Sequence, residues 1–331
     1  MKLLVLGGTK FLGRHVVEQA LAAGHAVTLF NRGQTNPSLF ADEVEKVVGD
    51  RVTDLHQLSD RHFDACIDPS GYLPQQLEIS GRVLKGVADR YVFISSISVY
   101  PRFVENLDES GELEVLADDV DRTVYNEQYY GAFKVLCEQA IEAAMPGRVL
   151  HVRSGLIVGP YDPTNRFTYW LERVARGGQV LAPESPGFPV QMIHAADQAR
   201  WLLETLDSDR MGVYNVTSDN GTYTLGEVID TAKRLTGSDA QPVWVSSEFL
   251  LAQEVRPWMG LPLWLPESRL NMSKVSARKA IDAGMTLMPL EDIIQSTIDW
   301  FRDEPEREWP AGMPEGQEQR LLETWRQQEQ R

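Results

Sequence analysis

The sequence predicts an α/β fold with a doubly wound parallel sheet, and three observations carry this prediction. Apolar, strand-like segments alternate with helical patterns through the first half of the chain. The first apolar segment breaks into a glycine-rich turn and resumes at once as a helical pattern. A second apolar segment follows that helix soon after Gly24. Alternation of this kind is typical of a parallel sheet with helices on both faces.

The predicted strands of this sheet all lie in the first half of the chain. They are expected over residues 3–6, 26–30, 44–48, 65–67, 91–95 and 149–152, with helical patterns between them, for example over 75–87 and 129–144. Proline and aromatic residues become denser after Pro160, and segments 213–216 and 243–245 are expected to return to the sheet or to flank it. We therefore expect a sheet domain over residues 1–160 and a smaller C-terminal region over 161–331 that ends in a helical tail.

A glycine-rich turn joins the first strand to the first helix. It contains Gly7, Gly8, Thr9, Lys10, Phe11, Leu12 and Gly13. A strand, a glycine turn and a helix in this order bring backbone N–H groups and a helix N-terminus together, where they can hold a pyrophosphate. The next strand completes a βαβ unit, so all seven residues are predicted to bind a dinucleotide within a Rossmann-like domain. An ordinary turn is the alternative for this motif taken alone.

Composition excludes several classes of protein. The chain has 331 residues, 43% of them hydrophobic and 24% charged, as expected for a globular protein of about two domains. A net charge of −16 argues against a nucleic-acid partner and an anionic membrane surface. Cys66 and Cys137 imply no disulfide framework, and the histidines lack metal-ligand spacing, so no metal is predicted. No apolar segment is long enough to span a membrane and the first strand begins at once, so we expect a cytoplasmic protein.

Two further segments carry candidate chemistry. Tyr130 and Lys134 are four residues apart in a helical pattern and therefore share a face. An ammonium group beside a phenol favours the phenolate and lowers its pKa, which suits Tyr130 to acid/base work on a carbonyl or hydroxyl. Upstream, a hydrophobic strand runs directly into Ser95, Ser96 and Ser98 at its carboxyl end, where a hydroxyl can bind a ligand oxygen. A solvated helix face and a turn-capping serine are the alternatives when each segment is taken singly.

Together, the glycine turn, the Ser-Ser-x-x-Val-Tyr segment over 95–100 and the Tyr-x-x-x-Lys helix resemble the short-chain dehydrogenase/reductase superfamily, in its extended and atypical NAD(P)-dependent epimerase/dehydratase branch. A weaker resemblance continues over residues 153–160 and 192–197. It implies that Tyr130 is the catalytic acid/base, that Lys134 holds the nicotinamide ribose and tunes the tyrosine, and that Ser96 orients the reacting oxygen. Ser95 is the alternative to Ser96. It also implies that residues 161–331 mainly form the substrate-binding region.

Two departures from the family pattern refine the resemblance. Lys10 stands where the extended branch has its middle glycine, and the resulting Gly-Gly-x-x-x-x-Gly form resembles the atypical isoflavone-reductase-like subgroup. Ile97 and Ser98 stand where the dehydratases of the family carry an Asp-Glu pair. Sugar dehydration therefore ranks below reduction and epimerisation.

The end of the second strand predicts which nicotinamide binds. An NAD site carries an acidic residue here for the ribose 2′-hydroxyl, whereas this chain has Asn31 and Arg32. Arg32 and Lys10 can bind a 2′-phosphate, so NADP(H) is favoured over NAD(H). The resemblance also places Asp50 at the adenine, and Ser70 and Gly71 at the nicotinamide-side ribose. Turn chemistry is the alternative for these three residues.

The sequence thus predicts an NADP(H)-dependent oxidoreductase that acts on a small carbonyl or alcohol substrate. The first alternative is a redox-neutral nucleotide-sugar epimerase with a tightly held NAD(P), for which Arg153, Arg166, Arg173 and Arg176 are candidate pyrophosphate ligands. The second is a non-catalytic or RNA-associated binding protein, disfavoured by the intact Tyr130–Lys134 pair. The resemblance also makes a homodimer plausible.

Overall fold

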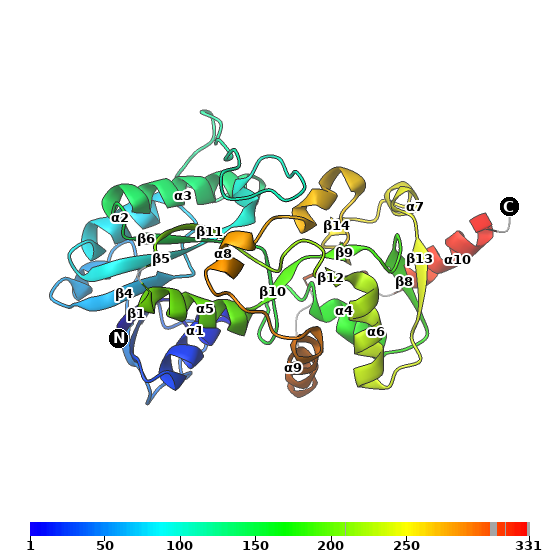
Figure 1. The fold of residues 1–331 in the computed structure, drawn as a ribbon, viewed down its shortest axis with the longest axis horizontal. Helices are drawn as coiled ribbons and strands as arrows, with labels where there is room; N and C mark the ends of the chain where they lie inside the picture. Colours follow the sequence, from blue (N-terminus) through cyan, green and yellow to red (C-terminus); the bar gives the residue numbers. More distant parts are fainter. Residues whose placement is uncertain (209, 305–309, 315, 330–331) are drawn as a thin grey trace.

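The computed structural model describes residues 1–208, 210–304, 310–314 and 316–329. Its centre is a seven-stranded sheet in the order β11-β6-β5-β4-β1-β2-β3 (Figure 1). The strands are β1 (Lys2–Leu6), β2 (Ala26–Asn31), β3 (Glu45–Val48), β4 (Phe63–Asp68), β5 (Ala88–Ser96), β6 (Val149–Ser154) and β11 (Gly212–Val216). Every neighbouring pair is parallel. The predicted doubly wound α/β fold is confirmed, and β11 extends the sheet from beyond Pro160.

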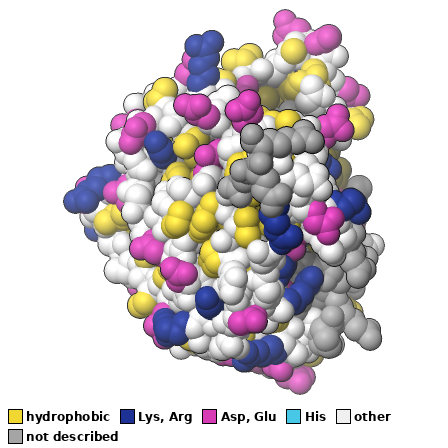
Figure 2. All heavy atoms as spheres, turned by 90° about the vertical axis from the view of Figure 1, so that its right-hand side faces the viewer, with side chains coloured by type: hydrophobic (Ala, Val, Ile, Leu, Met, Phe, Trp, Pro, Cys, Tyr) yellow, Lys and Arg dark blue, Asp and Glu magenta, His cyan; other side chains and the backbone are white. Residues whose placement is uncertain are grey.

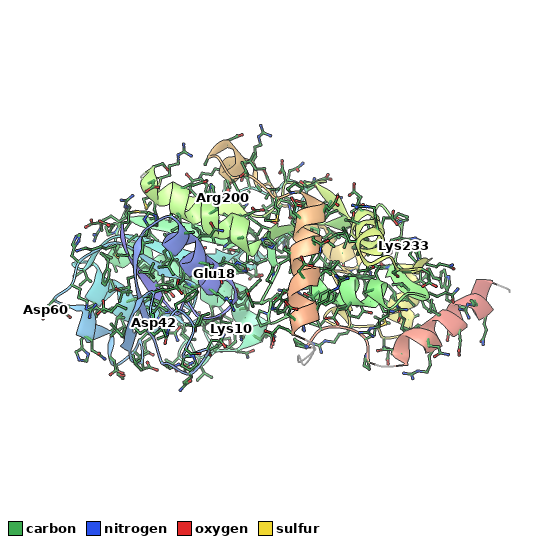
Figure 3. All side chains as sticks on the ribbon, turned by 90° about the horizontal axis from the view of Figure 1, so that it is seen from below. Lys10, Glu18, Asp42, Asp60, Arg200 and Lys233 are labelled. Carbon is green, nitrogen blue, oxygen red and sulfur yellow. The ribbon has the colours of Figure 1, made fainter. Side chains whose placement is uncertain are left out.

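Helices cover both faces of this sheet. On one face lie α1 (Phe11–Ala22) and α5 (Ala195–Asp207), side by side with Glu18 and Arg200 labelled on them in Figure 3. On the other face α2 (Pro74–Leu84) packs against α3 (Tyr130–Ala144). In β1, Leu3 and Val5 join the core under α1, whereas Leu4 and Leu6 join the core under α2 and α3. The strand is continuously apolar because both of its faces are buried.

A second region with its own core lies beside the carboxyl ends of the sheet strands (Figure 1). Its main helices, which pack on one another, are α4 (Thr168–Ala175), α6 (Leu225–Thr236) and α9 (Leu290–Asp303). A shorter helix of this region is α7 (Ser247–Ala252), whereas α8 (Arg278–Asp282) packs back against β11 of the central sheet. The two-stranded pairs are β7 (Leu156–Val158) with β10 (Met192–His194), β8 (Gln179–Pro183) with β13 (Gln241–Val245), β9 (Pro189–Val190) with β12 (Tyr223–Thr224), and β14 (Pro257–Trp258) with β15 (Leu261–Pro262). The predicted segment 243–245 therefore lies in β13, outside the central sheet.

The last helix, α10 (Gln317–Glu329), docks on this second core. Leu321 and Leu322 are buried in the core, and Arg173 pairs with Glu318 at 2.6 Å. Residues 209, 305–309, 315 and 330–331, all within the predicted 161–331 region, lie outside the described residues. Acidic and basic side chains are interspersed over this end of the molecule (Figure 2). None of the helices in the described ranges is long and apolar enough to cross a membrane.

Candidate active site

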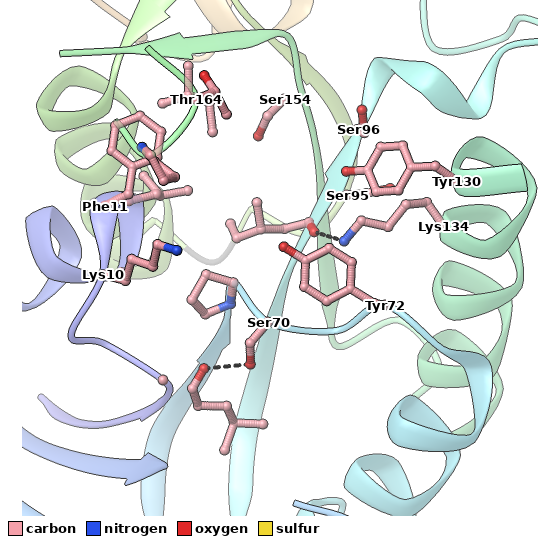
Figure 4. A pocket seen from close by; sticks show the side chains of 18 of the residues that line it. Lys10, Phe11, Ser70, Tyr72, Ser95, Ser96, Tyr130, Lys134, Ser154 and Thr164 are labelled. Atoms are coloured by element: carbon pink, nitrogen blue, oxygen red, sulfur yellow. Dashed lines mark hydrogen bonds between the residues drawn. The ribbon is translucent and has the colours of Figure 1, made fainter. Parts of the chain in front are cut away.

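A cavity of about 760 Å³ opens at the carboxyl ends of β1, β2, β4 and β5, where the strand order reverses around β1. Ligands of open parallel sheets bind at such a switch point. Residues of the second region, among them Arg166, Gln191 and Trp258, close the other side of the cavity. Figure 4 shows Lys10 pointing into it from the glycine turn and facing Lys134 across the space.

The structure brings the predicted site residues together around this cavity. The ones that line it are Gly7, Gly8, Thr9, Lys10, Phe11, Leu12, Gly13, Asn31, Arg32, Asp50, Ser70, Ser95, Ser96, Tyr130 and Lys134. Gly71 does not line it, but its carbonyl oxygen accepts a hydrogen bond from Lys134 Nζ at 2.7 Å. Predicted site residues that are up to 127 positions apart in the sequence, from Gly7 to Lys134, thus line the same cavity.

The glycine turn has the backbone that a pyrophosphate cradle requires. Gly7 and Gly8 have φ values of +117° and +88°, which L side chains rarely adopt. A Cβ at Gly8 would also lie 2.7 Å from the Leu29 side chain. Helix α1 begins at Phe11, and the Lys10 side chain makes no capping hydrogen bond to it. The first N–H groups of α1 and the ammonium group of Lys10 are therefore available to an anion.

Tyr130, Ser96 and Lys134 meet at the carboxyl end of β5. The Ser96 hydroxyl lies near the Tyr130 phenol (Figure 4) and accepts from Ser98 N at 3.1 Å. Lys134 Nζ is buried 5.9 Å from the centre of the Tyr130 ring and donates to the carbonyl oxygens of Gly71 (2.7 Å) and Ile94 (2.8 Å). An ammonium group has three donors, so one N–H of Lys134 is left for a ligand.

The two serines at this strand end differ in their partners. Ser96 Oγ accepts from Ser98 N, whereas the buried Ser95 Oγ finds no hydrogen-bond partner in the part of the chain that the structure describes. Both line the cavity. The geometry favours Ser96 as the group that acts with the tyrosine, and it leaves the Ser95 hydroxyl free for a ligand.

The electrostatics of Tyr130 differ from the sequence-based expectation. Burial raises the pKa of Tyr130, and the neighbouring Ser96 and the positive charge of Arg166 oppose that rise without cancelling it. The sequence predicts Lys134 as the cation beside this phenol, and its Nζ lies 5.9 Å from the centre of the ring. The structure adds Arg166 as a second cation, and burial lowers the pKa of Lys134 itself. The phenol is therefore held in its protonated, proton-donating form.

Gly131 is a site residue that sequence reasoning missed. A Cβ at this position would overlap the carbonyl oxygen of Ser98, so only glycine lets α3 approach the 96–98 turn this closely. This approach is what brings Tyr130 to Ser96. One signal in the sequence could have revealed it: glycine is unfavourable in helices, yet Gly131 directly follows Tyr130 at the start of the predicted helix.

We expect Gly131→Ala to destabilise the protein by about 1–3 kcal/mol, because the added methyl group overpacks this contact. Urea unfolding measures the change in the free energy of unfolding. Gly86→Ala is the matched control, since a Cβ at Gly86 meets no atom within 4 Å. Equal stability of the two variants would contradict the close approach.

The predicted adenosine end of the cavity, beside Asn31, Arg32 and Asp50, has both hydrogen-bonded and unpaired polar groups. Asn31 Nδ2 donates to Gly7 O at 2.8 Å and its Oδ1 accepts from Gly33 N at 2.9 Å, so this side chain braces the glycine turn. Asp50 Oδ1 accepts from Val52 N at 2.8 Å, as turn chemistry requires. Arg32 is exposed and, like Lys10, has no ion-pair partner among the described residues. Two cations are thus available at this end.

A buried ion pair, also missed from the sequence, supports the cavity floor. Arg51 binds the two carboxylate oxygens of Asp68 at 3.0 and 2.7 Å, and its Nη2 also donates to Ser80 Oγ at 2.8 Å. Tyr91 donates to Asp68 at 2.6 Å, and Ser70 Oγ donates to Leu6 O at 2.8 Å within the same network. Burial alone would raise the pKa of Asp68, but Arg51 and these hydrogen bonds hold it below its usual value.

Cys66, Cys137, His194 and Trp264 have structural roles. Cys66 and Cys137 are buried, and no group of side chains suited to a metal ion occurs in the described part of the chain. His194 Nδ1 accepts from Ala196 N at 3.2 Å and caps α5, and burial lowers its pKa to about 4. Trp258 lines the cavity, whereas Trp264 is buried in the second core.

Comparison with solved structures shows the same fold in epimerases. An epimerase-like structure from Burkholderia cenocepacia J2315, described as a putative epimerase, aligns with a TM-score of 0.70 at 17% identity, over 91% of this chain and 98% of that one. The UDP-glucuronic acid 4-epimerase of Bacillus cereus, solved with NAD, aligns with a TM-score of 0.66 at 16% identity, over 92% of this chain and 100% of that one.

Comparison with curated proteins finds two kinds of relative. The bifunctional pinoresinol-lariciresinol reductase of Forsythia intermedia is 23% identical over 276 residues, 76% of this chain and 81% of the reductase. The chloroplast stem-loop binding protein of 41 kDa b of Arabidopsis thaliana is 24% identical over 239 residues, 66% of this chain and 59% of that protein.

The family model described as "NAD dependent epimerase/dehydratase family" matches residues 3–217. The match spans the whole central sheet, from β1 through β11 and the strand ends that surround the cavity. It confirms the predicted superfamily branch and its class of nicotinamide-dependent reductases and epimerases. This chain belongs to the NAD dependent epimerase/dehydratase family.

Proposed function

We propose that this protein is an NADP(H)-dependent oxidoreductase that transfers a hydride between the nicotinamide and a small carbonyl or alcohol substrate. The observation that carries the proposal is that Tyr130, Ser96 and Lys134 line one wall of the cavity that begins at the glycine turn. A proton donor and an oxygen-binding hydroxyl are the groups that carbonyl reduction needs besides the hydride source.

The residues present fit a nicotinamide dinucleotide. Gly7, Gly8 and the first turn of α1 form a cradle that a Cβ at Gly8 would fill, and it suits the pyrophosphate. Lys134 has one N–H free for a ribose hydroxyl beside Tyr130. Ser70 lies between these two positions on the cavity floor (Figure 4).

In the proposed mechanism the chain's own residues handle the proton. When bound, the nicotinamide supplies or accepts the hydride. For reduction, Ser96 holds the substrate oxygen, and Tyr130 donates its phenolic proton to that oxygen as the carbon gains the hydride. Lys134 stabilises the phenolate that forms, and solvent returns the proton. Oxidation of an alcohol runs in the opposite direction, with Tyr130 as the base.

The two unpaired cations at the adenosine end support NADP(H) over NAD(H). A 2′-phosphate carries negative charge that Arg32 and Lys10 can bind, and the strand end has Asn31 where an NAD site carries an acid. Asn31 is also occupied in bracing Gly7 and Gly33, so it is a poor substitute for that acid.

We expect Arg32→Ala to weaken NADPH binding by about tenfold while NADH binding changes little, because only NADPH carries the 2′-phosphate. Fluorescence titration of the purified protein with each nucleotide measures both affinities. Arg82→Ala, an exposed arginine on α2 outside the cavity, is the matched control. A parallel loss for NADPH and NADH would rule out the phosphate contact.

A redox-neutral epimerase is the second candidate, because solved structures of NAD-bound epimerases share this fold. The two functions differ in whether the cofactor leaves between turnovers. Cofactor retained through purification, measured by absorbance after denaturation, would favour the epimerase. Free exchange of NADPH with consumption of a carbonyl compound would favour the oxidoreductase. If neither NADPH nor NADH binds to the protein freed of any retained cofactor, both functions are contradicted.

A further inference from the structure

The substrate side of the cavity contains an arginine without a carboxylate partner. Arg166 is half-buried, its Nε donates to Thr164 Oγ1 at 3.1 Å, and its guanidinium carbon lies 4.9 Å from the centre of the Trp258 ring. In the part of the chain that the structure describes, its terminal amino groups have neither an ion pair nor a hydrogen bond. Burial lowers the pKa of Arg166, which shows that its charge is poorly solvated. A desolvated, unpaired cation in a cavity wall is suited to bind an anion.

The acid nearest in the sequence does not satisfy this arginine. Asp162 is buried and accepts from Thr164 N at 2.8 Å and from Thr164 Oγ1 at 2.7 Å. Burial raises the pKa of Asp162, and the charge of Arg166 is too weakly coupled to reverse that rise. Asp162 therefore shapes the loop through Thr164, and it leaves the outer edge of the guanidinium open to the cavity.

Arg166 is the one cation at this end of the cavity among the described residues. The others that line the cavity lie elsewhere: Lys10 and Arg32 at the glycine turn, Arg51 on Asp68, and Lys134 beneath Tyr130. Of the arginines considered for a second pyrophosphate, Arg153 pairs with buried Glu138, Arg173 pairs with Glu318, and Arg176 lies outside the cavity. No second cation of the described residues stands beside Arg166 to share a pyrophosphate, whereas a single guanidinium matches the two oxygens of a single carboxylate.

The position of Arg166 also limits the size of the substrate. Arg166, Tyr130 and Ser96 line the same cavity, and the charge of Arg166 opposes the rise that burial causes in the pKa of the phenol. An anion bound by Arg166 therefore shares the cavity with the oxygen that Tyr130 serves. Trp258 covers the face of the guanidinium and leaves its edge for a planar, two-oxygen ligand. The bound anionic group and the reacting oxygen must therefore belong to one compact molecule.

We propose that the substrate is a small hydroxy or oxo acid whose carboxylate pairs with Arg166 while its hydroxyl or carbonyl oxygen meets Tyr130 and Ser96. The assignment rests on the oxidoreductase function proposed above. In oxidation, the C–H bond breaks with its hydride passing to the nicotinamide, and the O–H proton passes to Tyr130. The carboxylate is unchanged, and it holds the carbon in position.

The test compares carboxylates with their neutral amides. Lactate and lactamide, 3-hydroxybutyrate and 3-hydroxybutyramide, and inorganic phosphate are each titrated by calorimetry into the protein with and without NADPH. We expect each acid to bind about 10- to 100-fold more tightly than its amide, because only the acid forms a charge-assisted pair. Arg166→Met should remove this preference, and Arg166→Lys should keep part of it. Arg176→Met, at the end of α4 outside the cavity, should keep all of it.

Three results would overturn the inference: no binding of any acid, equal binding of acid and amide, or a preference that survives in Arg166→Met. Tighter Arg166-dependent binding of phosphate than of either acid would also overturn the carboxylate assignment. The affinity for NADPH separates this test from the proposed function. If the unaltered protein does not bind NADPH, the oxidoreductase is rejected. Arg166-dependent binding of the acids would still support the carboxylate site in that case.

Discussion

Replacing Tyr130 by phenylalanine is expected to lower kcat by about 100- to 10,000-fold while NADPH affinity stays within about twofold. The change removes only the phenolic hydroxyl, which is the proposed proton donor and lines the cavity with Ser96. The aromatic ring stays, so the packing of α3 on the cavity is kept. Single-turnover oxidation of NADPH with a confirmed carbonyl substrate measures the loss, and fluorescence titration measures the affinity.

Tyr129→Phe is the matched control for this experiment. Tyr129 is the neighbouring tyrosine, but it does not line the cavity. We expect its replacement to leave kcat nearly unchanged. A Tyr130→Phe variant with the kcat of the Tyr129→Phe variant would show that Tyr130 is not the acid/base.

The pH dependence provides a second readout of the same group. Burial raises the pKa of Tyr130, so the phenol stays protonated at neutral pH. Reduction, which needs the protonated phenol, should therefore be constant through neutral pH and fall as the pH rises through this raised pKa. Oxidation, which needs the phenolate, should rise over the same range. Both of these pH dependences should disappear in the Tyr130→Phe variant.

The largest expected effect on stability belongs to Arg51→Met. We expect a loss of about 3–5 kcal/mol in the free energy of unfolding, because the substitution leaves the fully buried Asp68 carboxylate without its cation. Urea unfolding at neutral pH measures the change. Arg61→Met removes an exposed pair with Glu45 and should cost at most about 1 kcal/mol.

The same ion pair gives stability a defined acid dependence. The pKa of Asp68 is lower in the folded protein than its unfolded value of about 3.9, so its contribution is fully present above that value. The contribution is lost as the pH falls through the lower folded pKa. Arg51→Met should therefore differ most from the unaltered protein near neutral pH and least in strong acid. Stability curves that stay parallel into acid would show that the pair does not stabilise the fold.

Arg51 and Asp68 also support the cofactor end of the site. Arg51 Nη1 donates to Ser70 Oγ at 3.3 Å, and Ser70 lines the cavity. The Arg51→Met variant should therefore bind NADPH more weakly even at temperatures where it is fully folded. This loss and the loss of stability have one cause, the release of Asp68 and Ser70.

Local sequence patterns predicted the central sheet well, for a physical reason. In β1 both faces are buried, so the strand is a continuous apolar segment that is visible without a partner. The glycine turn is equally local, since Gly8 must adopt positive φ next to Leu29 whatever follows in the chain. The segment 243–245 was harder to place, because a short apolar segment does not reveal its partner, which is β8 in the second region.

The site likewise has features that local sequence patterns predict and features that they do not. The sequence by itself determined the βαβ unit, the Tyr130–Lys134 spacing on one helix face and the serines at the end of β5, because each depends on neighbours within one or two turns of chain. Only the tertiary structure decided that Arg166 is a second cation acting on Tyr130, that Arg51 pairs with Asp68, and that Gly131 allows α3 to reach Ser98. These contacts join segments distant in the sequence, and their strength depends on burial, which no local pattern of residues records.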